Sequence, residues 1–70
     1  MDTYQRIAEL TAELRDARLT AAERKAAIRQ LHDLQHNIEL DEVVAIDIGD
    51  SAAADRLSAQ WTQIETALAA

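Results

Sequence analysis

Leu19-Thr20-Ala21-Ala22-Glu23 is the stretch of the sequence that decides the fold. Thr20 and Glu23 have the spacing of a capping box, in which each side chain binds the backbone N–H of the other residue at the start of a helix. Leu19, directly before the cap, has the position of a hydrophobic staple residue. The stretch therefore predicts a tight connection after one helix and the start of a second helix at Ala21.

Apolar residues recur at intervals of three and four on the N-terminal side of this capping box, which is typical of an amphipathic helix. Asp2 and Gln5 have the spacing of an N-cap residue and its partner in the first turn. We therefore predict a first helix over residues 3–18. Its apolar stripe consists of Tyr4, Ile7, Leu10, Leu14 and Ala17.

A second stripe follows the capping box with the same spacing. From Leu40 the pattern changes, because β-branched residues alternate with Ala45 and Asp47 in a way that favours a short strand. A single strand would have no partner in this chain, however, and no Gly or Pro before Gly49 would stop a helix. We predict a second helix over residues 21–48, with a bend near residues 37–41 as the alternative. The stripe consists of Ala27, Ile28, Leu31, Leu34, Gln35 and Ile38, and the β-branched residues are Val43, Val44, Ile46 and Ile48.

Gly49, Asp50 and Ser51 mark a second reversal of the chain. Glycine ends helices because it adopts a left-handed conformation at low cost, and Asp or Ser caps the helix that follows. A third helix is predicted over residues 51–69. Its stripe has the spacing of a coiled-coil seam and consists of Leu57, Trp61, Ile64 and Leu68.

The composition supports an all-α fold, because the chain has no Pro, one Gly and 15 Ala. Residues 1–70 are expected to form a single small helical domain, in which each short helix folds back on the long one as a hairpin with one face uncovered. Such a short chain buries little surface and has no Cys for a disulfide or zinc site, so an antiparallel coiled-coil or four-helix-type homodimer is expected to cover those faces. The expected dimer and core residues are Ile7, Leu10, Leu14, Leu31, Leu34, Ile38, Leu57, Trp61, Ile64 and Leu68.

The net charge of −6 is unevenly distributed along the chain. Residues 1–30 hold six basic and five acidic side chains, a balance of +1, whereas residues 31–70 hold one basic and eight acidic, a balance of −7. One interpretation is a purely structural coiled-coil dimerisation module, in which unlike ends of two copies meet. The other is a non-enzymatic inhibitor or adaptor that docks a basic protein surface, such as the DNA-binding region of a regulator. Its expected partner-binding residues are Glu39, Leu40, Asp41, Glu42, Val43, Val44, Asp47 and Asp50.

Catalytic signatures are not evident in the sequence, so we expect no enzymatic activity and no cofactor. No Ser is paired with a plausible base, no Cys can act as nucleophile and no Gly-rich loop can cradle phosphate. His32 and His36 are spaced to share a divalent metal, which makes a small metal-binding protein a further alternative, although no third ligand is evident. Direct nucleic-acid binding is not expected of an acidic chain. A cytoplasmic location without membrane contact is expected, because no apolar run approaches the ~20 residues of a membrane span.

Overall fold

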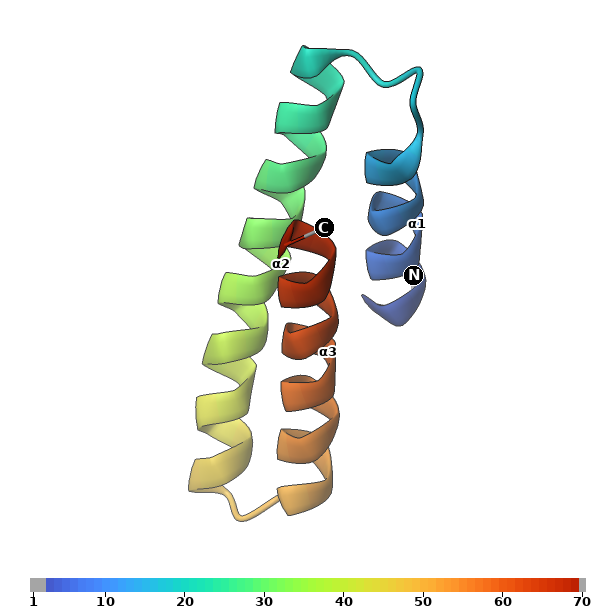
Figure 1. The fold of residues 1–70 in the computed structure, drawn as a ribbon. Helices are drawn as coiled ribbons and strands as arrows, with labels where there is room; N and C mark the ends of the chain where they lie inside the picture. Colours follow the sequence, from blue (N-terminus) through green and yellow to red (C-terminus); the bar gives the residue numbers. More distant parts are fainter. Residues whose placement is uncertain (1–2, 70) are drawn as a thin grey trace.

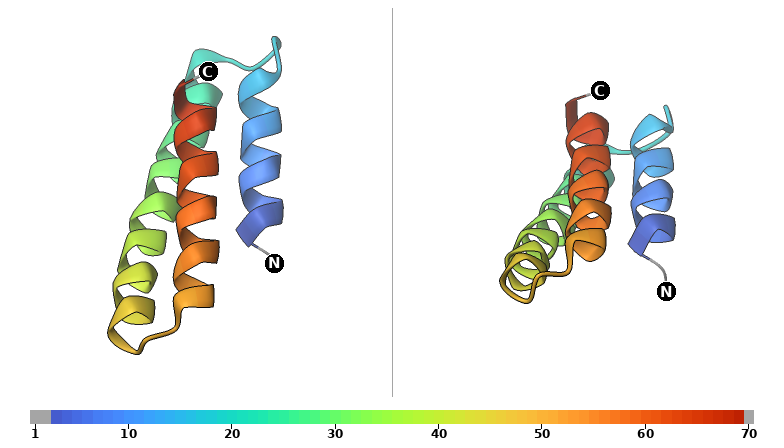
Figure 2. Two further views of the ribbon diagram at one scale, coloured as in Figure 1. Left: turned by 60° about the horizontal axis from the view of Figure 1, so that its bottom comes forward. Right: turned by 90° about the horizontal axis from the view of Figure 1, so that it is seen from below.

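The computed structural model describes residues 3–69, which form three helices joined by two short connections (Figure 1). The helices are α1 (Thr3–Arg15), α2 (Ala21–Asp47) and α3 (Ser51–Ala69), and the described residues contain no strand. Both short helices run antiparallel to α2 and lie on the same side of it (Figures 1 and 2). The prediction of an all-α fold is therefore confirmed. The N-cap predicted at Asp2 lies outside the described residues.

The first reversal is closed by the predicted capping box. The Thr20 side-chain oxygen accepts a hydrogen bond from the Glu23 backbone N–H at 3.1 Å, and the Glu23 carboxylate accepts one from the Thr20 backbone N–H at 3.2 Å. Arg24 then donates to the Leu14 carbonyl at 3.1 Å, which satisfies an acceptor left open at the end of α1. The start of α2 at Ala21 is confirmed.

The first helix ends at Arg15, three residues before the predicted end at residue 18. Asp16 is the cause, because its side-chain oxygen accepts a hydrogen bond from the Arg18 backbone N–H at 2.9 Å. A short Asp side chain that binds a nearby backbone group competes with the helical hydrogen-bond pattern and favours a turn. Ala17 is consequently exposed and does not continue the apolar stripe.

The long helix continues without interruption through residues 37–41 and ends at Asp47, one residue before the predicted end. The strand and the bend were therefore the wrong alternatives for this stretch. Gly49 follows with a φ of 76°, in the left-handed region that favours glycine. The Asp50 backbone N–H donates to the Ala45 carbonyl at 2.8 Å and the Gly49 N–H to the Ile46 carbonyl at 3.1 Å, which is the hydrogen-bond pattern of a Schellman motif.

Asp50 caps the last helix. Its side-chain oxygen accepts a hydrogen bond from the Ala53 backbone N–H at 3.1 Å, and its carbonyl accepts one from Ala54 at 3.0 Å. These bonds identify Asp50, rather than Ser51, as the N-cap residue of α3.

A single core joins all three helices. The C-terminal half of α3 lies beside both α1 and α2, so it covers a face that each predicted hairpin would leave open (Figure 2). The α1–α2 and α2–α3 hairpins form as predicted. They are not separate units, however, because both contribute residues to the same buried cluster. The buried apolar cluster consists of Ile7, Leu10, Ala27, Leu31, Ile38, Ile64 and Ala67.

The core also accommodates polar groups. Gln35 is 6% exposed and donates a hydrogen bond from its side-chain amide to the Glu65 carboxylate at 2.6 Å, linking α2 to α3. Among the described residues, no buried side-chain nitrogen or oxygen lacks a hydrogen-bond partner. None of the helices within residues 3–69 has the length and apolar character of a membrane span.

Candidate functional site

The C-terminal half of α2 has apolar side chains on two opposite sides. One side carries Ile38 and Ala45, which are buried against the rest of the bundle. The opposite side carries Leu40, Val43 and Val44, which are 55%, 58% and 58% exposed. Leu40, Val43, Val44 and Asp47 follow the three-four spacing of one helical face, so these four residues are called the outer face. A contiguous exposed group of this kind is typical of an interaction surface, unlike single exposed aliphatic residues.

The structure divides the eight residues expected to bind a partner into three groups. Leu40, Val43, Val44 and Asp47 form the outer face, and Asp41 beside them is also exposed. Glu42 is half-buried, and the Glu39 carboxylate accepts a hydrogen bond from the Trp61 ring N–H at 2.9 Å, which ties it to α3. Asp50 is the cap of α3. The exposed apolar surface therefore retains two of the five predicted acidic residues, Asp41 and Asp47, without a role in holding the bundle together.

Two further exposed aliphatic residues extend this surface at the end of α2. Ile46 is 63% exposed and Ile48 is 72% exposed. Both residues belong to the β-branched run of the sequence, but they are not among the predicted partner-binding residues. Their exposure enlarges the apolar surface toward the second connection.

The residues expected in the dimer or the core all lie in or against the core of the single chain. Five are buried, and five are partly buried hydrophobic residues packed on that cluster. The buried five are Ile7, Leu10, Leu31, Ile38 and Ile64, and the others are Leu14, Leu34, Leu57, Trp61 and Leu68. The chain uses these residues internally, whereas the outer face of α2 is an apolar surface that stays open to another molecule.

Three buried residues are not among those predicted to be in the core: Ala45, Gln60 and Ala67, which are only 4%, 8% and 9% exposed. Alanine and glutamine are weak signals, because both are also common on exposed helical faces. The one available signal is spacing: Ala67 lies three residues after Ile64 and Gln60 lies four residues before it.

The two histidines lie on α2, and both are exposed. Within residues 3–69, no group of three or more His, Cys, Asp or Glu side chains is arranged to hold a metal ion. Three or more protein ligands are usual for a zinc site. The metal-binding interpretation therefore rests on the His32 and His36 pair alone.

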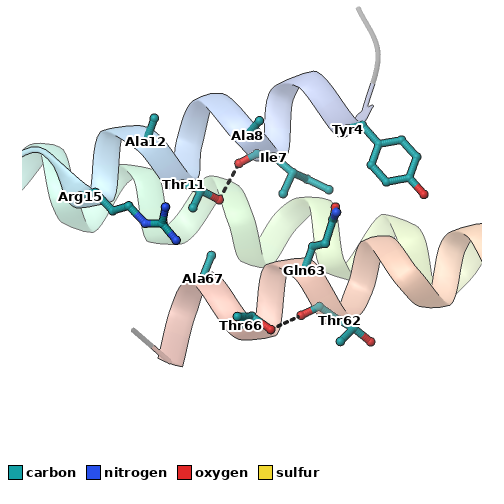
Figure 3. Close-up of a pocket in the computed structure, with 10 residues that line it drawn as sticks. All are labelled: Tyr4, Ile7, Ala8, Thr11, Ala12, Arg15, Thr62, Gln63, Thr66 and Ala67. Carbon is teal, nitrogen blue, oxygen red and sulfur yellow. Dashed lines mark hydrogen bonds between the residues drawn. The ribbon is translucent and has the colours of Figure 1, made fainter.

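An open groove of about 580 Å³ lies between α1 and α3 (Figure 3). The Thr11 hydroxyl donates to the Ile7 carbonyl at 2.7 Å and the Thr66 hydroxyl to the Thr62 carbonyl at 3.0 Å, so both hydroxyls bond within their own helices. Arg15 is the charged residue among those that line the groove. The lining therefore offers mainly small and apolar contacts, and consists of Tyr4, Ile7, Ala8, Thr11, Ala12, Arg15, Thr62, Gln63, Thr66 and Ala67.

Comparison of the chain with protein-family models, with curated proteins and with solved structures finds no match.

Proposed function

We propose that the protein functions by binding another protein, without catalysis, and that the outer face of α2 is its binding surface. The observation that carries this proposal is the exposure of Leu40, Val43 and Val44 on one face, each by more than half of its surface. Exposed aliphatic side chains of this kind supply affinity when a partner removes them from water.

The charges around this face indicate the chemistry of the partner. No Lys or Arg occurs between Asp33 and Asp55, whereas Asp41 and Asp47 are exposed beside the aliphatic residues. Acidic groups at the rim of an apolar surface accelerate the encounter with a basic partner and disfavour an acidic one. The partner is therefore a protein with a basic and partly apolar surface, such as the DNA-binding region of a regulator.

Such an interaction would make the protein an inhibitor or adaptor of that regulator. A DNA-binding surface that is covered by acidic side chains cannot reach phosphate at the same time. Direct nucleic-acid binding by the protein itself is not part of this proposal, because phosphate is repelled by a net negative chain. The proposal places the protein in the cytoplasm, together with the regulator.

The test uses a synthetic amphipathic helix with leucines along one side and lysines and arginines beside them. Titrated into the ¹⁵N-labelled protein, it is expected to shift the backbone amide signals of residues 40–48 and to bind more weakly as salt is added. Shifts confined to the groove between α1 and α3 would contradict the proposal.

Charge reversal provides the matched control for this titration. Asp47→Lys is expected to weaken peptide binding about three- to tenfold, because it replaces an attraction with a repulsion at the rim. Asp55→Lys changes the net charge equally on the exposed surface of α3 and is expected to have a smaller effect. Equal weakening by both variants would indicate nonspecific attraction to net charge instead of a defined surface.

A structural dimerisation module remains the second candidate function. It is favoured by the same exposed residues, since Leu40, Val43 and Asp47 have the spacing of a coiled-coil seam. The two candidates differ in the molecule that covers the outer face: a basic protein in one and a second copy in the other. A chain that dimerises but does not bind the basic helix would indicate the structural module, whereas binding of the basic helix indicates the inhibitor or adaptor.

A further inference from the structure

The seam spacing on the outer side of α2 extends over the full length of the helix. Eight positions alternate at intervals of four and three, as in a heptad pattern, and every one of them is exposed. This set is called the outer stripe. It consists of Ala22, Ala26, Arg29, Asp33, His36, Leu40, Val43 and Asp47.

The two halves of this stripe are complementary in charge and in size. The N-terminal half carries two alanines that allow close approach, Arg29 with Lys25 exposed beside it, and Asp33 next to the centre of the stripe, so its positive charge lies toward its outer end. The C-terminal half carries Leu40, Val43 and Asp47. Lys25 and Asp47 are 22 residues apart in one straight helix, or about 33 Å, so they cannot pair within one chain.

We propose that a second copy of this chain occupies the outer stripe, with the two α2 helices antiparallel about a two-fold axis near His36. In this arrangement Lys25 of each copy lies beside Asp47 of the other. Ala26 and Arg29 then cover the exposed aliphatic residues of the opposite copy. The charge complementarity selects the antiparallel orientation, because a parallel pair would place like charges side by side.

The bundle leaves room for this contact. Both α1 and α3 lie on one side of α2 (Figure 2), and all eight residues of the outer stripe are exposed. The core residues are already covered within each chain, and pairing therefore requires no rearrangement of the fold. A two-fold pair of this kind is also closed, since the same surface is used by both copies.

Self-association would compete with the binding of another protein to the outer face. This consequence rests on the proposed function, because it requires the basic partner to use the same residues. The pairing itself does not require that partner. At high concentration the chain would protect its own aliphatic surface, and dilution would expose it to a partner.

Sedimentation velocity on the purified chain tests the pairing. The wild type is expected to be dimeric at about 100 µM and to dissociate on dilution, as is usual for a small interface. Lys25→Glu and Asp47→Lys are each expected to raise the dissociation constant at least tenfold, because each creates two like-charge contacts. The double variant Lys25→Glu/Asp47→Lys restores opposite charges across an antiparallel pair and is expected to recover dimerisation.

Controls on α3 separate this contact from effects of net charge. Arg56→Glu and Asp55→Lys make the same charge changes at exposed positions on α3 and are expected to leave the dissociation constant unchanged. Circular dichroism of each variant checks that the helical content is retained.

Three results would overturn the pairing: a wild type that stays monomeric at about 1 mM, a double variant as weak as the single ones, or control variants that weaken association equally. Because only the purified chain is used, a failure of the basic-peptide titration leaves this result standing. Conversely, a chain that binds the peptide but stays strictly monomeric would contradict the self-association and leave the proposed function intact.

Discussion

Individual side chains determine where the helices of this protein begin and end. Thr20 and Asp50 cap α2 and α3 through bonds to backbone groups three residues ahead, and Gly49 provides the one positive φ found within residues 3–69. These features could be predicted from the sequence because they depend on neighbouring residues only. The early end of α1 at Arg15 could not be predicted in this way, because it depends on whether the Asp16 side chain bonds to solvent or to the Arg18 backbone N–H. The next residue, Ala17, gave no sign that the helix had ended.

The hydrogen bonds of Asp16 lead to a pH dependence. The Arg18 backbone N–H and, to a lesser extent, the Arg18 guanidinium lower the pKa of the Asp16 carboxyl below its usual value. A group with a lowered pKa in the folded state stabilises the fold above its unfolded pKa, and that contribution is lost as pH falls through the folded pKa. Titration of the Asp16 side chain by NMR is expected to give a lower pKa in the folded protein than in urea.

Arg18→Gln provides the control for this titration. It removes the guanidinium and keeps the backbone N–H, so the pKa of Asp16 is expected to rise only part of the way to its unfolded value. A carboxyl that titrates identically in the folded and unfolded protein would contradict the observed turn.

The long helix is the element in which the sequence pattern was hardest to interpret. Its stripe through Leu31 and Ile38 could be assigned to the core from spacing alone, and both residues are buried. Between Leu40 and Ile48, however, apolar residues occur on both sides of the helix, so periodicity does not distinguish core from surface. The distinction depends on where α3 lies, which is tertiary information: Ala45 is buried, whereas Val43 and Val44 are exposed.

Replacing Leu by Ala at two positions of α2 tests which side of the helix belongs to the core. Leu31 is completely buried and Leu40 is 55% exposed. Leu31→Ala is expected to lower the free energy of unfolding by about 2–5 kcal/mol, because it leaves a cavity in the core. Leu40→Ala is expected to change it by no more than about 0.5 kcal/mol. Urea denaturation at low protein concentration measures both, and equal losses would show that Leu40 belongs to the core.

The molecule as a whole is elongated, with extents of 44 × 23 × 15 Å, and one buried cluster joins its three helices. Leu10, Leu31 and Ile64 come from three different helices, and all are completely buried in one cluster. Helix lengths from the sequence predict the two hairpins, because a short helix after a tight turn must lie along the long one. The contact between α1 and α3 depends on the angles at which they lie on α2, and local patterns do not contain this information.

A shared core predicts that the two hairpins unfold together. Leu10→Ala in α1 creates a cavity in the cluster and is expected to reduce the amide hydrogen-exchange protection of α3 around Ile64 as much as that of α1 and α2. Two independent hairpins would instead lose protection in α1 and the first half of α2 only. Val44→Ala, an exposed truncation on α2, is the control and is expected to leave all three helices protected. Hydrogen exchange followed residue by residue by NMR distinguishes the two patterns, and full protection of α3 in Leu10→Ala would exclude a single cooperative core.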